Sequence, residues 1–267
     1  MFIGHLGVGL ALKRADREVS LGVLVFAALL LDFLLGLFVL AGLEQVHVPS
    51  NYARLHYLRF TFPWSHGLLM SLVWSGTAGL AAWAWFRRMG PAEPATRAAH
   101  ALRAGGIVAA AVFSHFVGDL IEHPPQLPVV GLKSPLLGLG LWDHLDLALT
   151  LEVALVVWGV AAYLGSFATV GRWERQGLIA FMAILSASAV AGQAGSSVPP
   201  ALGANIAAWL GLPVLLGSLA GWFDRRLERA DAARGTGSAR GAGAARGGAA
   251  MGRLAAGDAT GRAERTP

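Results

Sequence analysis

The chain has 267 residues, of which 55% are hydrophobic and only 14% are charged. A soluble domain carries about 25% charged residues, so this composition excludes an ordinary soluble enzyme and predicts a polytopic membrane protein. The chain has no cysteine, which excludes disulfide bonds and thiolate ligands. Any bound metal must therefore be held by His, Asp and Glu.

The first twelve residues are apolar but too few to cross a bilayer, because a transmembrane helix needs about 20 apolar residues. Lys13, Arg14 and Arg17 follow this run, whereas in a secretory signal the basic residues precede it. We therefore expect residues 1–20 to form a half-helix that dips into the bilayer, followed by a basic turn. His5 would then lie about 12 Å from Lys13 along the helix.

Six longer apolar runs predict six membrane spans, at residues 21–43, 66–86, 105–121, 144–166, 177–196 and 205–223. The third run is short, and we expect its helix to extend at both ends. The predicted fold class is thus an all-α transmembrane bundle in residues 21–223. The last two spans are rich in small residues and hold no ionisable group, so we expect residues 167–223 to be scaffold and the functional site to lie in 1–166.

Lysine and arginine are concentrated in alternate connections. Basic clusters precede the first span and follow the second, fourth and sixth spans, while the other connections hold only Arg54, Arg59 and Lys133. The positive-inside rule therefore predicts that both termini are cytoplasmic. Residues 124–143, rich in Pro and Gly, cannot cross lipid as irregular backbone and are expected to cap the outer mouth of the bundle.

Residues 224–267 form a tail of Arg, Gly and Ala that contains nine of the 21 basic residues. This composition is typical of a disordered cytoplasmic segment, and weak attraction to anionic lipid headgroups is a second interpretation. The tail has no aromatic residue on which bases could stack, so we expect no nucleic-acid partner. The expected partner is membrane lipid.

Few ionisable side chains interrupt the N-terminal run and the first four spans: His5, Asp32, His66, His115, Asp119 and Glu152. Ionisable groups at membrane depth are costly, and they usually face inward, pair with one another and mark a functional site. Each also has a structural explanation when taken alone. His66 follows Pro63 and Ser65 at a helix start, and Asp32 or Glu152 could be a carboxyl satisfied by a neighbouring helix.

The segment 113–123 holds four ionisable side chains: His115, Asp119, Glu122 and His123. Counted from the first, they lie 0, 4, 7 and 8 residues along the chain, which places all four on one face of a helix. A His and an Asp four residues apart can supply two metal ligands from one helix. His66, His115 and Asp119 are therefore the strongest ligand candidates. His47, His56 and His100 are expected to be solvated.

The candidate ligands are expected at different depths in the membrane, which is difficult to reconcile with a single bound ion. Straight helices would spread His66, His115, Asp119 and Asp32 over about 15 Å, whereas metal–ligand bonds of about 2.0–2.2 Å require the ligands to converge. Tilted or broken helices, a pair of ions, or carboxylates that only orient the histidines would each resolve it.

Several segments resemble the bacterial membrane-bound metal-dependent hydrolase family, the YdjM-like inner-membrane proteins: MFIGHLGVGLALK, LLLDFLLGL, FPWSHGLL, FSHFVGDLIEHP and GLGLWDH. The resemblance covers roughly residues 1–166, and its Ser-His and Ser-His-x-x-x-Asp elements are the most recognisable. It implies a bacterial inner-membrane location. That family is thought to be distantly related to zinc-dependent phospholipases C, which bind zinc through an ordered series of His, Asp and Glu ligands.

The resemblance implies a divalent metal, zinc by expectation, bound by residues that follow that order: His5, Asp32, His66, His115 and Asp119. His123 or His144 and then Glu152 would come next, but their spacing departs from the pattern. The implied activity is hydrolysis of a phosphoester or a lipid-derived ester by metal-activated water, with Glu152 or Glu122 as general base.

Two interpretations from other classes remain open. The intramembrane His, Asp and Glu residues at staggered depths could form the relay of a proton- or cation-coupled transporter, although the two halves show no internal repeat. The chain could also be a non-catalytic membrane scaffold whose ionisable groups pair internally.

Overall fold

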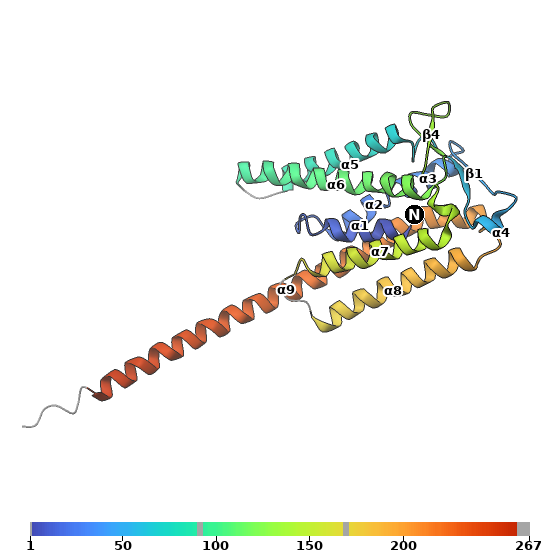
Figure 1. Cartoon of the computed structure of the whole chain (residues 1–267). Coiled ribbons are helices and arrows are strands. Elements are labelled where there is room, and N and C mark those ends of the chain that lie inside the picture. The colour runs from blue at the N-terminus through green and yellow to red at the C-terminus, as the bar shows by residue number, and fades with distance from the viewer. Residues whose placement is uncertain (1, 90–92, 168–170, 261–267) are drawn as a thin grey trace, which may run out of the picture.

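The computed structural model describes residues 2–89, 93–167 and 171–260. Eight helices form the bundle: α1 (Ile3–Leu12), α2 (Leu21–Ala28), α3 (Leu30–Leu40), α5 (Leu68–Met89), α6 (Pro94–Glu122), α7 (Leu145–Leu164), α8 (Arg172–Gly195) and α9 (Leu202–Thr260). Five of them are long and apolar enough to cross a membrane, and α2 with α3 makes a sixth, bent span. The predicted all-α bundle of six spans with a short N-terminal helix is confirmed (Figure 1).

The first span is broken rather than straight. Helices α2 and α3 meet at Leu29 with a bend of 51°, and Leu29 itself has non-helical angles of φ −107° and ψ 6°. Asp32 therefore lies in the first turn of a new helix instead of the middle of a continuous one.

Helix α6 is 29 residues long and confirms that the third span extends at both ends. Glu93 caps its start by accepting hydrogen bonds from the N–H groups of Ala95 and Thr96, with Pro94 in the first turn. It ends where His123 turns extended before a proline, which restricts the preceding residue to that conformation.

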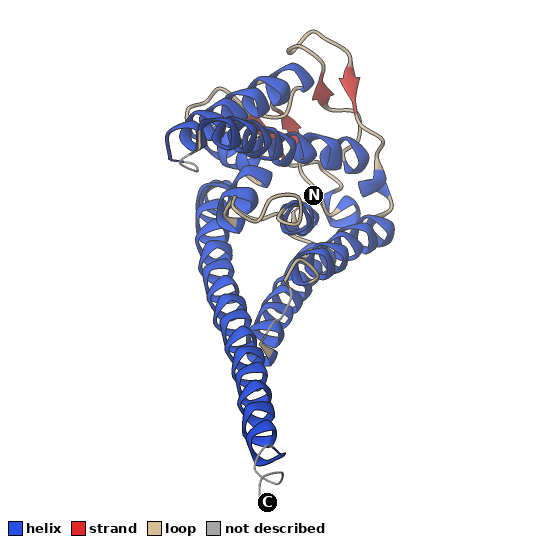
Figure 2. Ribbon diagram, turned by 90° about the vertical axis from the view of Figure 1, so that its left-hand side faces the viewer, coloured by secondary structure: helices blue, strands red, loops and turns tan. Residues whose placement is uncertain are grey.

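Two small antiparallel hairpins, drawn in red in Figure 2, lie at one end of the bundle (Figure 1). The first pairs β1 (Gln45–His47) with β2 (Arg59–Thr61), and the second pairs β3 (Leu127–Pro128) with β4 (Leu136–Leu137). A single-turn helix α4 (Tyr52–Leu55) and a 3-10 turn η1 (Leu141–Asp143) complete these connections. Phe62 and Leu127 from the connections pack with Phe116 of α6 in a buried cluster, so both connections close onto the bundle.

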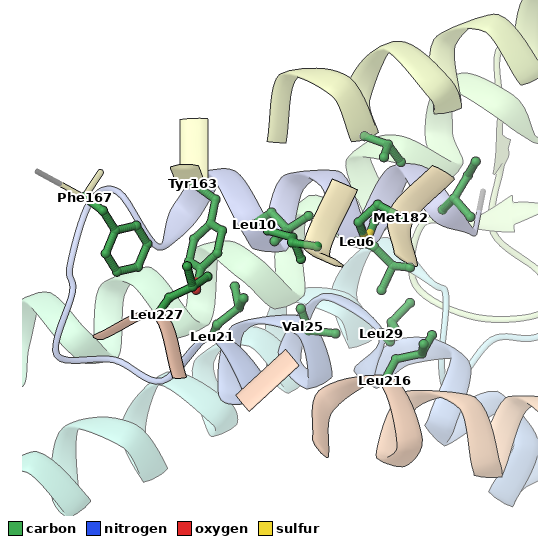
Figure 3. Close-up of a cluster of buried hydrophobic side chains, with 13 residues drawn as sticks. Leu6, Leu10, Leu21, Val25, Leu29, Tyr163, Phe167, Met182, Leu216 and Leu227 are labelled. Carbon is green, nitrogen blue, oxygen red and sulfur yellow. The ribbon is translucent and has the colours of Figure 1, made fainter. Parts of the chain in front are cut away.

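Helix α1 lies inside the bundle, where its apolar residues join a buried cluster with α2, α7, α8 and α9. Figure 3 shows Leu6 and Leu10 of α1 beside Leu21, Val25 and Leu216. The backbones of α1 and α7 approach so closely that a Cβ atom on Gly159 would overlap the carbonyl oxygen of Gly7. Small residues allow this contact between α1 and α7.

The predicted C-terminal tail begins as part of the folded bundle. Asp224 and Leu227 are buried, and Asp224 Oδ2 lies 2.8 Å from Lys13 Nζ. Helix α9 thus continues past residue 223, and its backbone is helical to Thr260, beyond the other helices (Figure 1). The boundary at residue 224 stays a prediction, while contacts with the basic turn reach α9 as far as Asp231. Residues 261–267 lie outside the described part.

Candidate metal centre

The five residues predicted as metal ligands lie in one cluster: His5, Asp32, His66, His115 and Asp119. Donor atoms of His5, His115 and Asp119 all lie within 4.8 Å of one another, and so do those of Asp32, His66 and His115. The 15 Å spread expected from straight helices is therefore wrong. Four of the five residues are buried, and Asp32 is partly buried.

The candidate ligands lie much closer together than straight helices would allow, because three of them lie at helix starts or in a connection and the other two lie on α6. His5 is in the first turns of α1, which starts inside the bundle, and Asp32 follows the break at Leu29. His66 lies in the connection before α5 rather than within it. These three meet His115 and Asp119 on adjacent turns of α6.

Three donor atoms have separations close to those that one tetrahedral ion requires. His66 Nε2 and His115 Nε2 are 3.2 Å apart, and Asp119 Oδ2 is 3.4 Å from each. Asp32 Oδ1 is 3.8 Å from both nitrogens. Ligands bound tetrahedrally at about 2.0–2.2 Å lie roughly 3.3–3.6 Å from one another. His66, His115 and Asp119 thus match a single site, and Asp32 lies beside both histidines at a longer distance.

Hydrogen bonds orient both imidazoles with Nε2 toward this site. His115 Nδ1–H donates to the carbonyl oxygen of Ala28 at 2.7 Å, at the end of α2. His66 Nδ1 lies 2.7 Å from Ser65 Oγ, whose own O–H donates to Glu44 Oε2 at 2.7 Å. Both neutral rings therefore carry their proton on Nδ1. Two nitrogen lone pairs then face each other, an arrangement that a shared cation stabilises.

His5 has a different position in the cluster. Its Nε2 contacts Asp119 Oδ1 at 3.2 Å, whereas His66 and His115 contact Asp119 Oδ2. Its ring also stacks on that of His115, with 3.7 Å between the centroids. His5 thus contacts two other members of the cluster and belongs with them to one of the two groups that could hold a metal ion.

A cavity of about 280 Å³ borders the cluster. Asp32, His66, Asp119, His123 and Glu152 form its polar side. Its apolar side consists of aromatic and aliphatic residues from the connections, α3 and α9: Phe2, Leu35, Phe60, Phe62, Trp142, Ala208, Trp209, Leu212 and Pro213. Gln193 of α8 also lines it, so the segment predicted as scaffold supplies part of this wall.

The two predicted general bases are placed differently. Glu152 lines the cavity, and its Oε2 accepts hydrogen bonds from the backbone N–H groups of Phe2 and Gly4 at 2.8 and 3.2 Å. It therefore also anchors the start of α1. Glu122 accepts a hydrogen bond from Trp142 Nε1 at 2.8 Å and is not among the residues that line the cavity.

Of the two later histidines, only His123 reaches the site. Its Nε2 lies 3.6 Å from Asp119 Oδ2, and its ring lines the cavity. The Gln126 side-chain amide contacts its Nδ1, and that same amide accepts the N–H of Phe60 through Oε1 at 3.1 Å. His144 is exposed and immediately precedes α7, outside the cluster.

Sequence reasoning missed Glu44, which is 2% exposed and lies in the connection after α3. Burial raises the pKa of its carboxyl, and hydrogen bonds from Ser65 and Trp64 oppose that rise. Ser65 was expected only as a helix-start residue and as part of a Ser-His element. Glu44 is far from His66 in sequence and has no helical spacing to it, so no pattern could have indicated the contact.

Comparison with protein-family models, with curated proteins and with solved structures gave no match. The resemblance to membrane-bound metal-dependent hydrolases therefore stays a prediction. What the described residues show is a multi-span helical protein with buried His and Asp groups that could hold a metal ion.

Proposed function

We propose that the chain is a membrane-embedded, metal-dependent hydrolase. Its divalent cation, zinc in this proposal, is bound by His66, His115, Asp119 and Asp32. The observation that carries the proposal is the set of separations of 3.2–3.4 Å among the donor atoms of His66, His115 and Asp119, which suit tetrahedral coordination. Asp32 Oδ1 lies 3.8 Å from both histidine nitrogens and completes the proposed ligand set.

The chemistry of the site follows from the ligands and the cavity beside them. A bound divalent metal lowers the pKa of a coordinated water to about 7 and polarises an ester oxygen. Glu152 is the carboxylate of the cavity wall that is not a ligand, so it is our candidate for the general base. His5 holds the Asp119 carboxylate in the orientation that presents Oδ2 to the ligand set.

The lining of the cavity favours a lipid-derived ester over a soluble phosphoester. The lining residues include no Lys or Arg, the side chains that commonly bind phosphate oxygens. Five aromatic residues and several aliphatic ones line it instead. A membrane lipid with an uncharged ester near the ligand set suits this composition.

Elemental analysis of the detergent-purified protein tests the metal site. We expect about one zinc equivalent in the wild type and loss of that metal in His115→Ala and Asp119→Ala, each of which removes a ligand. His47→Ala is the matched control, because His47 bonds to Thr61 in the first hairpin, outside the cluster. Retention of wild-type metal by both ligand variants would show that the ligand assignment is wrong.

Hydrolysis of ester-bearing lipids in vesicles tests the activity. We expect turnover by the metal-loaded wild type, with neutral acyl esters cleaved faster than soluble phosphodiesters. Glu152→Gln should keep its metal and lose at least about 100-fold in rate, as general-base catalysis contributes about 10²–10⁴-fold. A metal-loaded wild type that cleaves neither class contradicts the hydrolase proposal.

The alternatives make different predictions. The transporter interpretation relied on staggered depths, whereas the side chains cluster. Ion flux in proteoliposomes that disappears in Asp32→Asn would favour it nevertheless. A scaffold whose His115–Asp119 pair serves only packing should tolerate replacement of both residues by leucine with stability largely unchanged.

A further inference from the structure

We propose that Glu44, acting through Ser65, is a positioning residue for His66. In this proposal it holds the His66 imidazole in the tautomer that presents the unprotonated Nε2 to the metal. The inference rests on the proposed metal site, but its central claim concerns the metal-free protein and can be tested there.

Glu44 is surrounded by donors from the segment that carries His66. Its Oε1 accepts the backbone N–H groups of Trp64 and Ser65, both at 2.8 Å, and its Oε2 accepts the Ser65 hydroxyl at 2.7 Å. These contacts tie the connection after α3 to the turn before α5. Three of the carboxylate's acceptor positions are thus directed at two consecutive residues.

The direction of the hydrogen bonds follows from the number of protons available. An ionised carboxylate only accepts, and a serine hydroxyl has one proton to donate. Because Ser65 donates that proton to Glu44, its oxygen can only accept from the His66 Nδ1–H, 2.7 Å away. The neutral His66 ring therefore has no proton on Nε2.

The opposite tautomer has its own hydrogen-bond partners in the cluster. A proton on His66 Nε2 would point at His115 Nε2, 3.2 Å away, and at Asp119 Oδ2, 3.4 Å away. Without the hydrogen bond at Nδ1, this proton could form hydrogen bonds within the cluster, and a metal would have to displace it. The Glu44–Ser65 pair opposes that state.

Glu44→Gln reverses the direction of the hydrogen bonds from His66 through Ser65 to residue 44, with little change in side-chain shape. The glutamine Oε1 can still accept the two backbone N–H groups, but its amide nitrogen donates to Ser65 Oγ instead of accepting from it. Ser65 can then give its proton to His66 Nδ1, which favours the tautomer with a proton on Nε2.

Nitrogen-15 NMR of histidine-labelled, metal-free protein in detergent measures this directly, with the His66 signals identified by their loss in His66→Gln. We expect a protonated Nδ1 in the wild type and a protonated Nε2 in Glu44→Gln.

Chelator competition should show zinc affinity about 10- to 100-fold weaker in Glu44→Gln, as for other residues that orient metal ligands. Ser65→Ala, which removes the link, should weaken zinc binding similarly, and Ser65→Thr, which keeps the hydroxyl, should restore it.

Asp143→Asn is the matched control. Asp143 Oδ1 also accepts a hydroxyl, that of Tyr57 at 2.7 Å, and it lies among the connections at the same end of the bundle. This pair leads to no histidine of the cluster, so His66 tautomer and zinc affinity should stay at wild-type values.

The outcomes separate this inference from the proposed function. Wild-type protein that binds no metal but shows the tautomer switch refutes the metal site and supports the role of Glu44. Zinc-binding wild type whose affinity and His66 tautomer survive both Glu44→Gln and Ser65→Ala overturns the positioning role alone. If Glu44→Gln does not fold, Ser65→Ala and Ser65→Thr decide.

Discussion

Asp119 uses its two carboxylate oxygens for different contacts. Oδ1 faces His5 at 3.2 Å, and Oδ2 faces His66 and His115 at 3.4 Å. Asp32, by contrast, approaches the same histidine nitrogens only to 3.8 Å, and its side chain is 18% exposed. The two carboxylates should therefore contribute unequally to metal affinity.

We expect Asp119→Asn to weaken zinc binding by more than about 100-fold, the upper value for residues that merely orient ligands. Asparagine keeps one oxygen, so it cannot serve both His5 and the metal. Asp32→Asn keeps a neutral oxygen ligand at a longer distance and should lose less. Chelator competition on both variants measures the difference, and a larger loss in Asp32→Asn would reverse the assignment.

The residues of the site were predictable, but most of their interactions were not. His115 and Asp119 stand out because ionisable groups are rare in apolar helices, and their spacing places both on one face. The hydrogen bond from His115 to Ala28 and the contact from Glu44 to Ser65 join distant segments. No periodicity encodes such pairs, because they depend on how separate elements pack.

At the scale of elements, the bend between α2 and α3 decides whether a compact site can form. The run 21–43 is apolar except for Asp32, and no Pro or Gly marks Leu29, so sequence reasoning treats it as one straight helix. The break leaves the Ala28 carbonyl to accept from His115 and places Asp32 in the first turn of α3. Six spans were predictable from hydropathy, whereas no residue pattern indicates this bend.

The position of α1 depends on its contact with α7. A Cβ on Gly159 would meet backbone atoms of Gly7, which cannot move aside as a flexible side chain could. Gly159→Ala should therefore push α1 and His5 away from the site, destabilising the protein by about 1–3 kcal/mol, the usual cost of overpacking. Thermal unfolding and zinc affinity should both fall.

Gly106→Ala is the control for this effect. Gly106 lies in α6, the helix of His115, but a Cβ there would meet no atom within 4 Å. Zinc affinity should match the wild type, and thermal stability should not fall, because alanine has the higher helix propensity. Wild-type stability and affinity in Gly159→Ala would mean that α1 and α7 do not approach this closely.

At the scale of the whole molecule, a second polar group joins the basic turn to α7 and α9. Lys13 is 1% exposed, and its Nζ contacts Asp224 Oδ2 at 2.8 Å and Glu228 Oε1 at 3.0 Å. Asp224 also accepts the Tyr163 hydroxyl and the Leu21 N–H. The predicted basic turn thus belongs to the packed structure, which explains why α9 stays attached beyond the last span.

Lys13→Met should destabilise the protein by roughly 3 kcal/mol, the lower end for removing one partner of a buried ion pair, because Asp224 keeps two other donors. Arg17→Met is the matched control in the same turn. The Arg17–Asp231 pair has an Arg side chain 43% exposed, and such pairs contribute about 0–1 kcal/mol. Methionine would also keep an apolar contact with Phe167, whose ring Arg17 covers. Unfolding followed by tryptophan fluorescence in detergent should therefore show a much larger loss for Lys13→Met. Equal losses would mean that the turn is held by surface contacts, and α9 would then need another anchor to the bundle.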